Sequence, residues 1–120
     1  MNIITPVFRI FDVTKAKEFY IDWLGFSQDW EHRFGENFPL YMSVSKEAIT
    51  IHLSEHHGDA CPGSKIMINY PNLQEYCNLL NAKDYRYFKP SIYEAHWGSY
   101  IMEVTDPFGN KIMFSEPKTT

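Results

Sequence analysis

The fold is decided by residues 97–117, WGSYIMEVTDPFGNKIMFSEP, in which two strand-like runs flank a turn at 106–110. Proline and glycine between runs of β-branched, aromatic and aliphatic residues predict a β-hairpin. Because successive side chains of a strand point to opposite faces, the hairpin has an apolar side, which we expect to be core, and a mixed side, which is typical of a binding surface. The apolar side comprises Tyr100, Met102, Val104, Ile112 and Phe114, and the mixed side comprises Trp97, Ser99, Ile101, Glu103, Lys111, Met113 and Ser115.

The first half of the chain predicts one strand, one helix and three further strands. Residues 7–11 alternate enough for a strand, with Phe8 and Ile10 on one face and Thr5, Val7 and Arg9 on the other. Asp12 or Thr14 is expected to cap a helix that ends at Gly25. The helix has one apolar stripe, made of Ala16, Phe19, Tyr20, Trp23 and Leu24. Three strands are then predicted at 26–32, 40–44 and 48–54.

The second half repeats this order after a loop at 55–64. A strand is predicted at 66–69, a helix capped by Asn72 follows it, and a short strand is predicted at 85–88, with 91–96 irregular before the closing hairpin. The stripe of this helix is Leu73, Tyr76, Cys77 and Leu80. We therefore predict an α+β fold in a single domain, 1–120, built from two β-α-β-β-β modules at about 1–57 and 65–117.

Composition excludes several classes of function. The chain has 120 residues, 44% of them hydrophobic, and no apolar run approaches the length of about 20 that a membrane helix needs. A net charge of −4 without a basic block predicts no nucleic-acid partner, but it suits a cationic ligand. Cys61 and Cys77 form no CxxC pair, and the first residues lack the features of a secretion signal. We expect reduced thiols and a cytoplasmic protein, with no membrane association.

Five short motifs together resemble the glyoxalase, bleomycin resistance protein and extradiol dioxygenase superfamily, also called the vicinal oxygen chelate fold. They are Phe11-Asp12-Val13, Glu18-Phe19-Tyr20, Leu24-Gly25-Phe26, Trp97-Gly98 and Asp106-Pro107-Phe108-Gly109-Asn110. The resemblance implies two βαβββ modules whose curved mixed sheets surround a cleft, and a homodimer. Trp97-Gly98 looks most like the bleomycin resistance branch, which implies antibiotic resistance through a bleomycin-like small-molecule ligand.

Enzymes of this superfamily bind a divalent metal at positions whose counterparts here are Thr5, residues 63–65 and Met113. None of these is the His, Glu or Asp that such a metal requires, so we predict no metal, no cofactor and no catalytic residue. The alternative is a glyoxalase-like lyase or dioxygenase that uses a divalent metal such as zinc, held by His52 and Glu103. His56 and His57 are a further candidate pair, but neighbours on an extended chain point apart and are not expected to converge.

The predicted ligand site combines rings with polar groups. Arg9 is interpreted either as the partner of Glu103 in an ion pair or as a clamp for an anionic substrate, and His52 either as a ligand contact or as a solvated polar residue. The rings suit a planar or cationic ligand, although a dimer interface would have the same composition. The predicted ligand-binding residues are Arg9, Trp30, His32, Tyr41, His52, Trp97, Glu103 and Met113. Two functions follow as hypotheses: sequestration of such a ligand, or binding of an unrelated metabolite without resistance.

Overall fold

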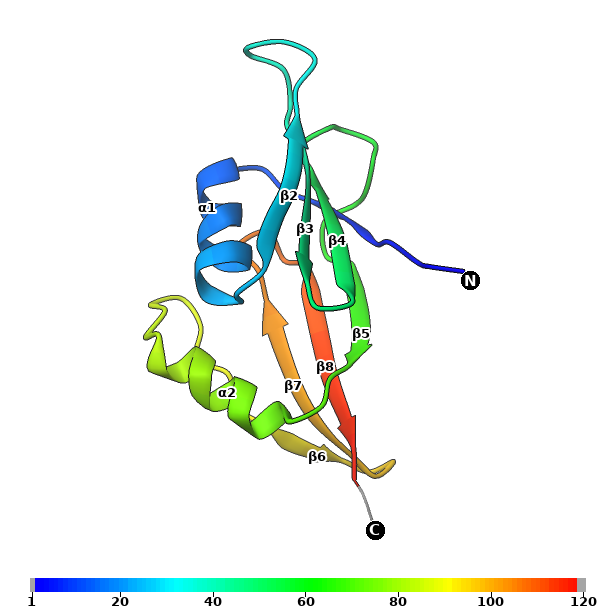
Figure 1. Ribbon diagram of the computed structural model, residues 1–120, viewed down its shortest axis with the longest axis vertical. Helices are drawn as coiled ribbons and strands as arrows, with labels where there is room; N and C mark the ends of the chain where they lie inside the picture. The colour runs from blue at the N-terminus through cyan, green and yellow to red at the C-terminus, as the bar shows by residue number, and fades with distance from the viewer. Residues whose placement is uncertain (1, 119–120) are drawn as a thin grey trace. The chain divides into compact units, whose positions relative to one another are not determined.

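The computed structural model describes residues 2–118 and separates into two compact units. The first comprises Met1–Ser64 together with Asp106–Asn110, and the second comprises Lys65–Thr105 together with Lys111–Thr120. Each unit contains one four-stranded mixed sheet and one helical segment (Figure 1). The predicted α+β class and the repeated order of elements are therefore confirmed.

The first unit has the strand order β1-β4-β3-β2, in which only the β1–β4 pair is parallel. A parallel pair needs a crossover connection, and here the chain between β1 and β4 passes through the helix and the β2–β3 pair. The elements are β1 Val7–Arg9, α1 Val13–Lys17, the π-helical segment η1 Glu18–Trp23, β2 Ser27–His32, β3 Tyr41–Lys46 and β4 Ile49–Ser54.

The helix covers one face of this sheet and leaves the other for a site. Asp12 caps α1 by accepting a hydrogen bond of 2.9 Å from the Lys15 amide, as the sequence predicts. Gly25 ends the helix with φ of 89°, a left-handed conformation that glycine adopts without strain. The whole predicted stripe is buried, together with the alternating strand residues that it meets: Phe8, Ile10, Ala16, Phe19, Tyr20, Trp23, Leu24, Met42, Val44, Ile51 and Leu53.

The turn Asp106–Asn110 is part of the first unit, although the two strands that it joins, β7 Ser99–Thr105 and β8 Lys111–Pro117, are part of the second. Asp106 accepts hydrogen bonds on Oδ2 from the Tyr20 hydroxyl at 2.6 Å and from Asn110 Nδ2 at 2.9 Å. Its Oδ1 accepts from the amides of Phe108 and Asn110. Asn110 Nδ2 also donates to the carbonyl oxygen of Arg9 at 2.7 Å. Asp106, Asn110 and Tyr20 are all buried, so this turn fastens the helix and β1 to one another.

The second unit repeats the arrangement with the strand order β5-β8-β7-β6, where β5 and β8 are parallel. The elements are β5 Lys65–Asn69, α2 Leu73–Ala82, β6 Tyr93–Ala95, β7 Ser99–Thr105 and β8 Lys111–Pro117. The predicted hairpin forms in the predicted register, since Met102 faces Phe114, Val104 faces Ile112 and Glu103 faces Met113. Four of the five residues assigned to the core side are buried. Tyr100 is the exception at 37% exposure, because it lies near the end of β7, where the Lys118 ammonium is 5.5 Å from its ring centroid.

Two local predictions in this unit were wrong. Residues 85–88 form no strand; the strand is β6, at 93–95, within the segment predicted to be irregular. Antiparallel pairing of Tyr93 with Ile101 and of Ala95 with Ser99 creates this strand, so tertiary context decides its position. Asn72 is in a left-handed conformation with φ of 58° and makes no side-chain cap. Instead, the Glu116 carboxylate accepts from the amides of Asn72 at 2.8 Å and Leu73 at 3.1 Å.

Candidate ligand-binding site

Five of the eight predicted ligand-binding residues lie on one face of the first sheet. Paired residues of neighbouring strands share a face, and the register gives two such rows across the sheet. The first row is Val7, His52, Ser43 and Trp30, and the second is Arg9, Ser54, Tyr41 and His32. This face is opposite the helix, so Arg9, Trp30, His32, Tyr41 and His52 occupy the same surface.

An irregularity in the edge strand β2 sets the position of Trp30. The pairing of β2 with β3 shifts between Gln28 and Trp30, which leaves Asp29 as an extra residue. The Asp29 carboxylate accepts hydrogen bonds from the hydroxyls of Ser43 at 2.9 Å and Ser45 at 2.7 Å. The bulge is thereby held in place, and Trp30 lies opposite Ser43 on the open face.

Trp30, Tyr41 and His52 form one cluster of rings. The rings of Trp30 and Tyr41 are stacked, with centroids 5.9 Å apart and planes inclined by 11°. His52 meets both edge-on, at 5.3 Å from Trp30 and 5.2 Å from Tyr41. The Tyr41 hydroxyl lies 2.7 Å from His52 Nδ1. Trp30 is nevertheless 47% exposed, so a large aromatic surface is available to a bound molecule.

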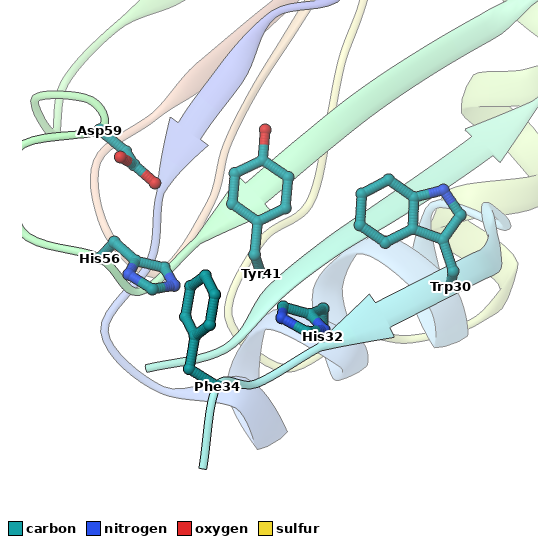
Figure 2. A pocket seen from close by; sticks show the side chains of 6 residues that line it. All are labelled: Trp30, His32, Phe34, Tyr41, His56 and Asp59. Carbon is teal, nitrogen blue, oxygen red and sulfur yellow. The ribbon is translucent and has the colours of Figure 1, made fainter. Parts of the chain in front are cut away.

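A pocket of about 380 Å³ opens beside this cluster (Figure 2). Phe34, from the β2–β3 loop, meets His32 at a centroid distance of 4.8 Å and His56 at 6.1 Å, in both cases with nearly perpendicular planes. Ser54 anchors the opposite wall, because its hydroxyl donates to Asp59 Oδ2 at 2.7 Å and accepts from the His56 amide at 3.0 Å. The six lining residues are Trp30, His32, Phe34, Tyr41, His56 and Asp59.

One carboxylate, that of Asp59, lines the pocket. Burial, followed by the nearby Asp59 carboxylate, raises the pKa of the Tyr41 phenol. The phenol therefore stays protonated near neutral pH and can donate its hydrogen to His52 Nδ1. In that arrangement a neutral His52 carries its own hydrogen on Nε2.

Arg9 and Glu103 each have close neighbours within their own unit. Glu103 pairs with Lys65 of the second unit, with 2.8 Å between Oε2 and Nζ. The Arg9 guanidinium carbon lies 4.5 Å from the Phe11 ring centroid, and within residues 2–118 its buried Nε has no hydrogen-bond partner. Glu103 thus has an ion-pair partner within its own unit. The pairing of Arg9 with Glu103 stays a prediction.

The remaining three predicted residues belong to the second unit. Trp97 is 53% exposed in the β6–β7 turn, with its ring centroid 5.1 Å from that of His96. Glu103 is half-buried beside Lys65. Met113 is buried in a small apolar cluster with Ala95 and Ile101. Trp97 thus offers an open ring, whereas Met113 is mainly a packing residue.

The residues at the family's metal positions do not fit a divalent cation. Met113 is paired across the sheet with Met67 and Glu103, and thioether sulfur is a poor ligand for such a metal. Thr5 is exposed. His52 and Glu103, the alternative ligands, already have partners in Tyr41 and Lys65. Within residues 2–118, no three His, Cys, Asp or Glu residues are grouped to hold a metal ion.

Sequence reasoning missed three of the six pocket residues as ligand contacts. Phe34 and Asp59 lie in loops, where no strand periodicity assigns a face to them. His56 was considered, beside His57, as a metal ligand or as an acid and base, whereas the structure places it against Phe34 in the pocket wall. Their loop composition alone contained no usable signal.

Comparison with known proteins identifies the family of this chain and shows which solved structures share its fold. A family model described as glyoxalase superfamily protein matches residues 1–120. A bleomycin-binding protein solved with bleomycin has a TM-score of 0.73 and 17% identity, covering 98% of this chain and 100% of that one. The bleomycin resistance determinant encoded on transposon Tn5 has a TM-score of 0.77 and 16% identity, covering 99% and 100%.

An antibiotic-binding protein from Streptomyces sp. CB03234 has a TM-score of 0.73 and 18% identity, and the match covers 98% of this chain and 97% of that one. At these identities the likeness shows a common fold. No curated protein matches the chain. Over residues 2–118, the helices are too short and polar to cross a membrane.

Proposed function

Since the chain belongs to the glyoxalase superfamily, we propose that it is a binding protein of the bleomycin resistance type, which sequesters a planar or cationic ligand without breaking a bond. The observation that carries the proposal is the stacked pair of Trp30 and Tyr41, in which Trp30 is 47% exposed. An exposed, rigid aromatic pair binds planar groups by stacking and cations by their attraction to the ring face. The fold shared with bleomycin-binding and antibiotic-binding proteins supports the same function.

The roles in this mechanism follow from the positions of the side chains. Trp30 and Tyr41 stack on the ligand, His32 borders the pocket, and His52 and Arg9 supply polar contacts from the same sheet face. Trp97, Glu103 and Met113 are proposed contacts on the second unit. The protein is proposed to act in the cytoplasm, as a homodimer and without a metal or other cofactor.

Titration with bleomycin tests this function directly. We expect saturable quenching of tryptophan fluorescence with a stoichiometry of about one ligand per chain, because Trp30 lies in the proposed site. Mass spectrometry of the recovered ligand should show bleomycin unchanged. The absence of saturable binding would contradict the bleomycin resistance type, and a chemically altered ligand would contradict sequestration.

Metal content is a separate prediction. The purified protein, incubated with zinc, nickel, iron or manganese and then desalted, is expected to retain far less than one metal ion per chain, because its candidate ligands are occupied or chemically unsuitable. Elemental analysis measures this directly. Near-stoichiometric retention, lost on replacing His52 or Glu103 with alanine, would instead support the metal-dependent enzyme.

A further inference from the structure

We propose that the pocket lined by Trp30, His32, Phe34, Tyr41, His56 and Asp59 recognises an alkylated ammonium group, with Asp59 as its counter-charge. This assignment rests on the proposed function, because it names the chemical class of ligand that the same site takes. It is a narrower statement than aromatic binding, since stacking alone does not distinguish a neutral ligand from a charged one.

The first argument is the arrangement of the rings. The rings of Phe34 and His32 are nearly perpendicular, as are those of Phe34 and His56, whereas Trp30 and Tyr41 are almost parallel. Figure 2 shows that these side chains come from separate segments and border a common space. Rings at several angles present faces and edges from different directions, which suits a rounded group better than a flat one. Such aromatic enclosures are known to recognise methylated ammonium ions.

The second argument is the charge of the lining. With histidines neutral, Asp59 is the only ionised residue of the six. Its carboxylate is oriented by the Ser54 hydroxyl, which also fixes the adjacent loop through the His56 amide. Burial, and after it the Asp59 carboxylate, raises the pKa of the Tyr41 phenol in the pocket wall. Asp59 is an exposed residue, so its attraction for a cation is moderate and screened by salt.

Nearby positive charge sets a limit on this attraction. Arg9 lies in the same cross-strand row as Tyr41, separated from it by Ser54. Arg33 follows the pocket residue His32 in the chain, but it borders a different hollow with Phe38 and Glu55. Arg9 is therefore the positive group whose removal strengthens binding of a cation, whereas a clamp for anions would lose affinity on the same change.

The experiment compares choline with 3,3-dimethylbutan-1-ol, its neutral isostere, by tryptophan fluorescence. Choline is expected to bind about fivefold more tightly, as a partly screened charge interaction of this kind predicts. Asp59→Asn should remove most of this preference without changing the affinity for the neutral isostere. Asp12→Asn is the matched control, because Asp12 is also an exposed hydrogen-bond acceptor, for the Lys15 amide, but does not line the pocket.

Three further measurements complete the test. Phe34→Ala should weaken both ligands, whereas Phe38→Ala, in the same loop and also exposed, should weaken neither. Arg9→Gln should increase the affinity for choline. Raising the salt concentration should reduce the preference of the unmodified protein for choline, which tests the charge without any substitution.

The outcomes separate this inference from the proposed function. Equal affinity for choline and its isostere, or equal effects of the two aspartate substitutions, would overturn the ammonium site even if bleomycin binds. Preferential choline binding that depends on Asp59 supports the ammonium site, and if bleomycin fails to bind the same protein, only the bleomycin resistance type is overturned.

Discussion

Replacing Asp106 with asparagine is expected to lower the free energy of unfolding by about 2 to 3 kcal/mol, the range for lost hydrogen bonds to a buried charged group. Oδ1 and Oδ2 accept from four donors: the Tyr20 hydroxyl, the Asn110 amide side chain and the backbone amides of Phe108 and Asn110. An asparagine NH₂ group has no lone pair to offer. In either orientation of its amide, at least one donor faces another donor in the buried turn.

Urea unfolding provides the measurement, with a lower midpoint and an unchanged m-value as the expected result. Asp12→Asn is the matched control, because it is the same chemical change at an exposed N-cap, where asparagine caps as well as aspartate does. Tyr20→Phe removes one of the four donors, and its loss of unfolding free energy should be smaller than that of Asp106→Asn and larger than that of Asp12→Asn. A loss at Asp106 no larger than that at Asp12 would contradict the argument.

The dependence on pH follows from the same environment. Burial raises the pKa of Asp106, and the hydrogen bonds from Tyr20, Asn110 and the backbone amides only partly offset this effect. When the pKa of a carboxyl group is higher in the folded than in the unfolded state, the group contributes stability at low pH. This contribution is fully present below the unfolded-state pKa and is lost as the pH rises through the folded-state pKa. The difference in unfolding free energy between wild type and Asp106→Asn should therefore increase as the pH falls through the raised pKa of Asp106 toward its ordinary value of 3.8. A protonated Asp106 remains compatible with the turn, because its hydroxyl can donate to the Tyr20 oxygen and still accept from Asn110.

Replacing Trp30 with alanine is expected to weaken bleomycin binding about tenfold or more, since aromatic stacking on a planar group is worth about 1 to 3 kcal/mol. The substitution removes half of the stacked pair and opens one wall of the pocket. Because Trp30 is also a fluorescent reporter, isothermal titration calorimetry is the appropriate measurement. Trp30→Phe should retain part of the affinity.

Two controls accompany this result: the stability of the Trp30 variant, and the removal of an exposed ring in the second unit. Trp30 is 47% exposed on an edge strand whose residues are all exposed, so its loss should change the unfolding midpoint little. Tyr87→Ala removes a ring that is 62% exposed in the second unit and that we place outside the site, and it should leave affinity unchanged. Undiminished binding by Trp30→Ala would exclude the stacked pair as the ligand platform.

The parts of the fold that depend on periodic side-chain patterns could be predicted from the sequence. The hairpin follows from the turn residues at 106–110 and the strand-like runs on either side, and the first helix follows from its apolar stripe. Residues 93–95 could not be assigned, because three residues become a strand only through their pairing with β7. The cap of α2 could not be predicted either, because the residue that accepts from the Asn72 amide, Glu116, is 44 residues away in the sequence.

The candidate site divides in the same way. Strand parity was enough to place His52, Tyr41 and Trp30 on one face. Phe34 and Asp59 reach the pocket from loops whose path is set by contacts such as that between Ser54 and Asp59. The ion pair between Glu103 and Lys65 could not be predicted either, because it depends on a distance between side chains that a sequence does not contain.

The turn at 106–110 also has a consequence for separating the two halves of the chain. The repeated order of elements gives the appearance of two interchangeable halves, each encoded by its own half of the gene. A polypeptide that stops at Ser64, however, leaves the Tyr20 hydroxyl and the Arg9 carbonyl without the partners that Asp106 and Asn110 provide. The symmetry of the two halves is therefore one of element order, whereas the first compact unit includes five residues, Asp106–Asn110, from the second half of the sequence.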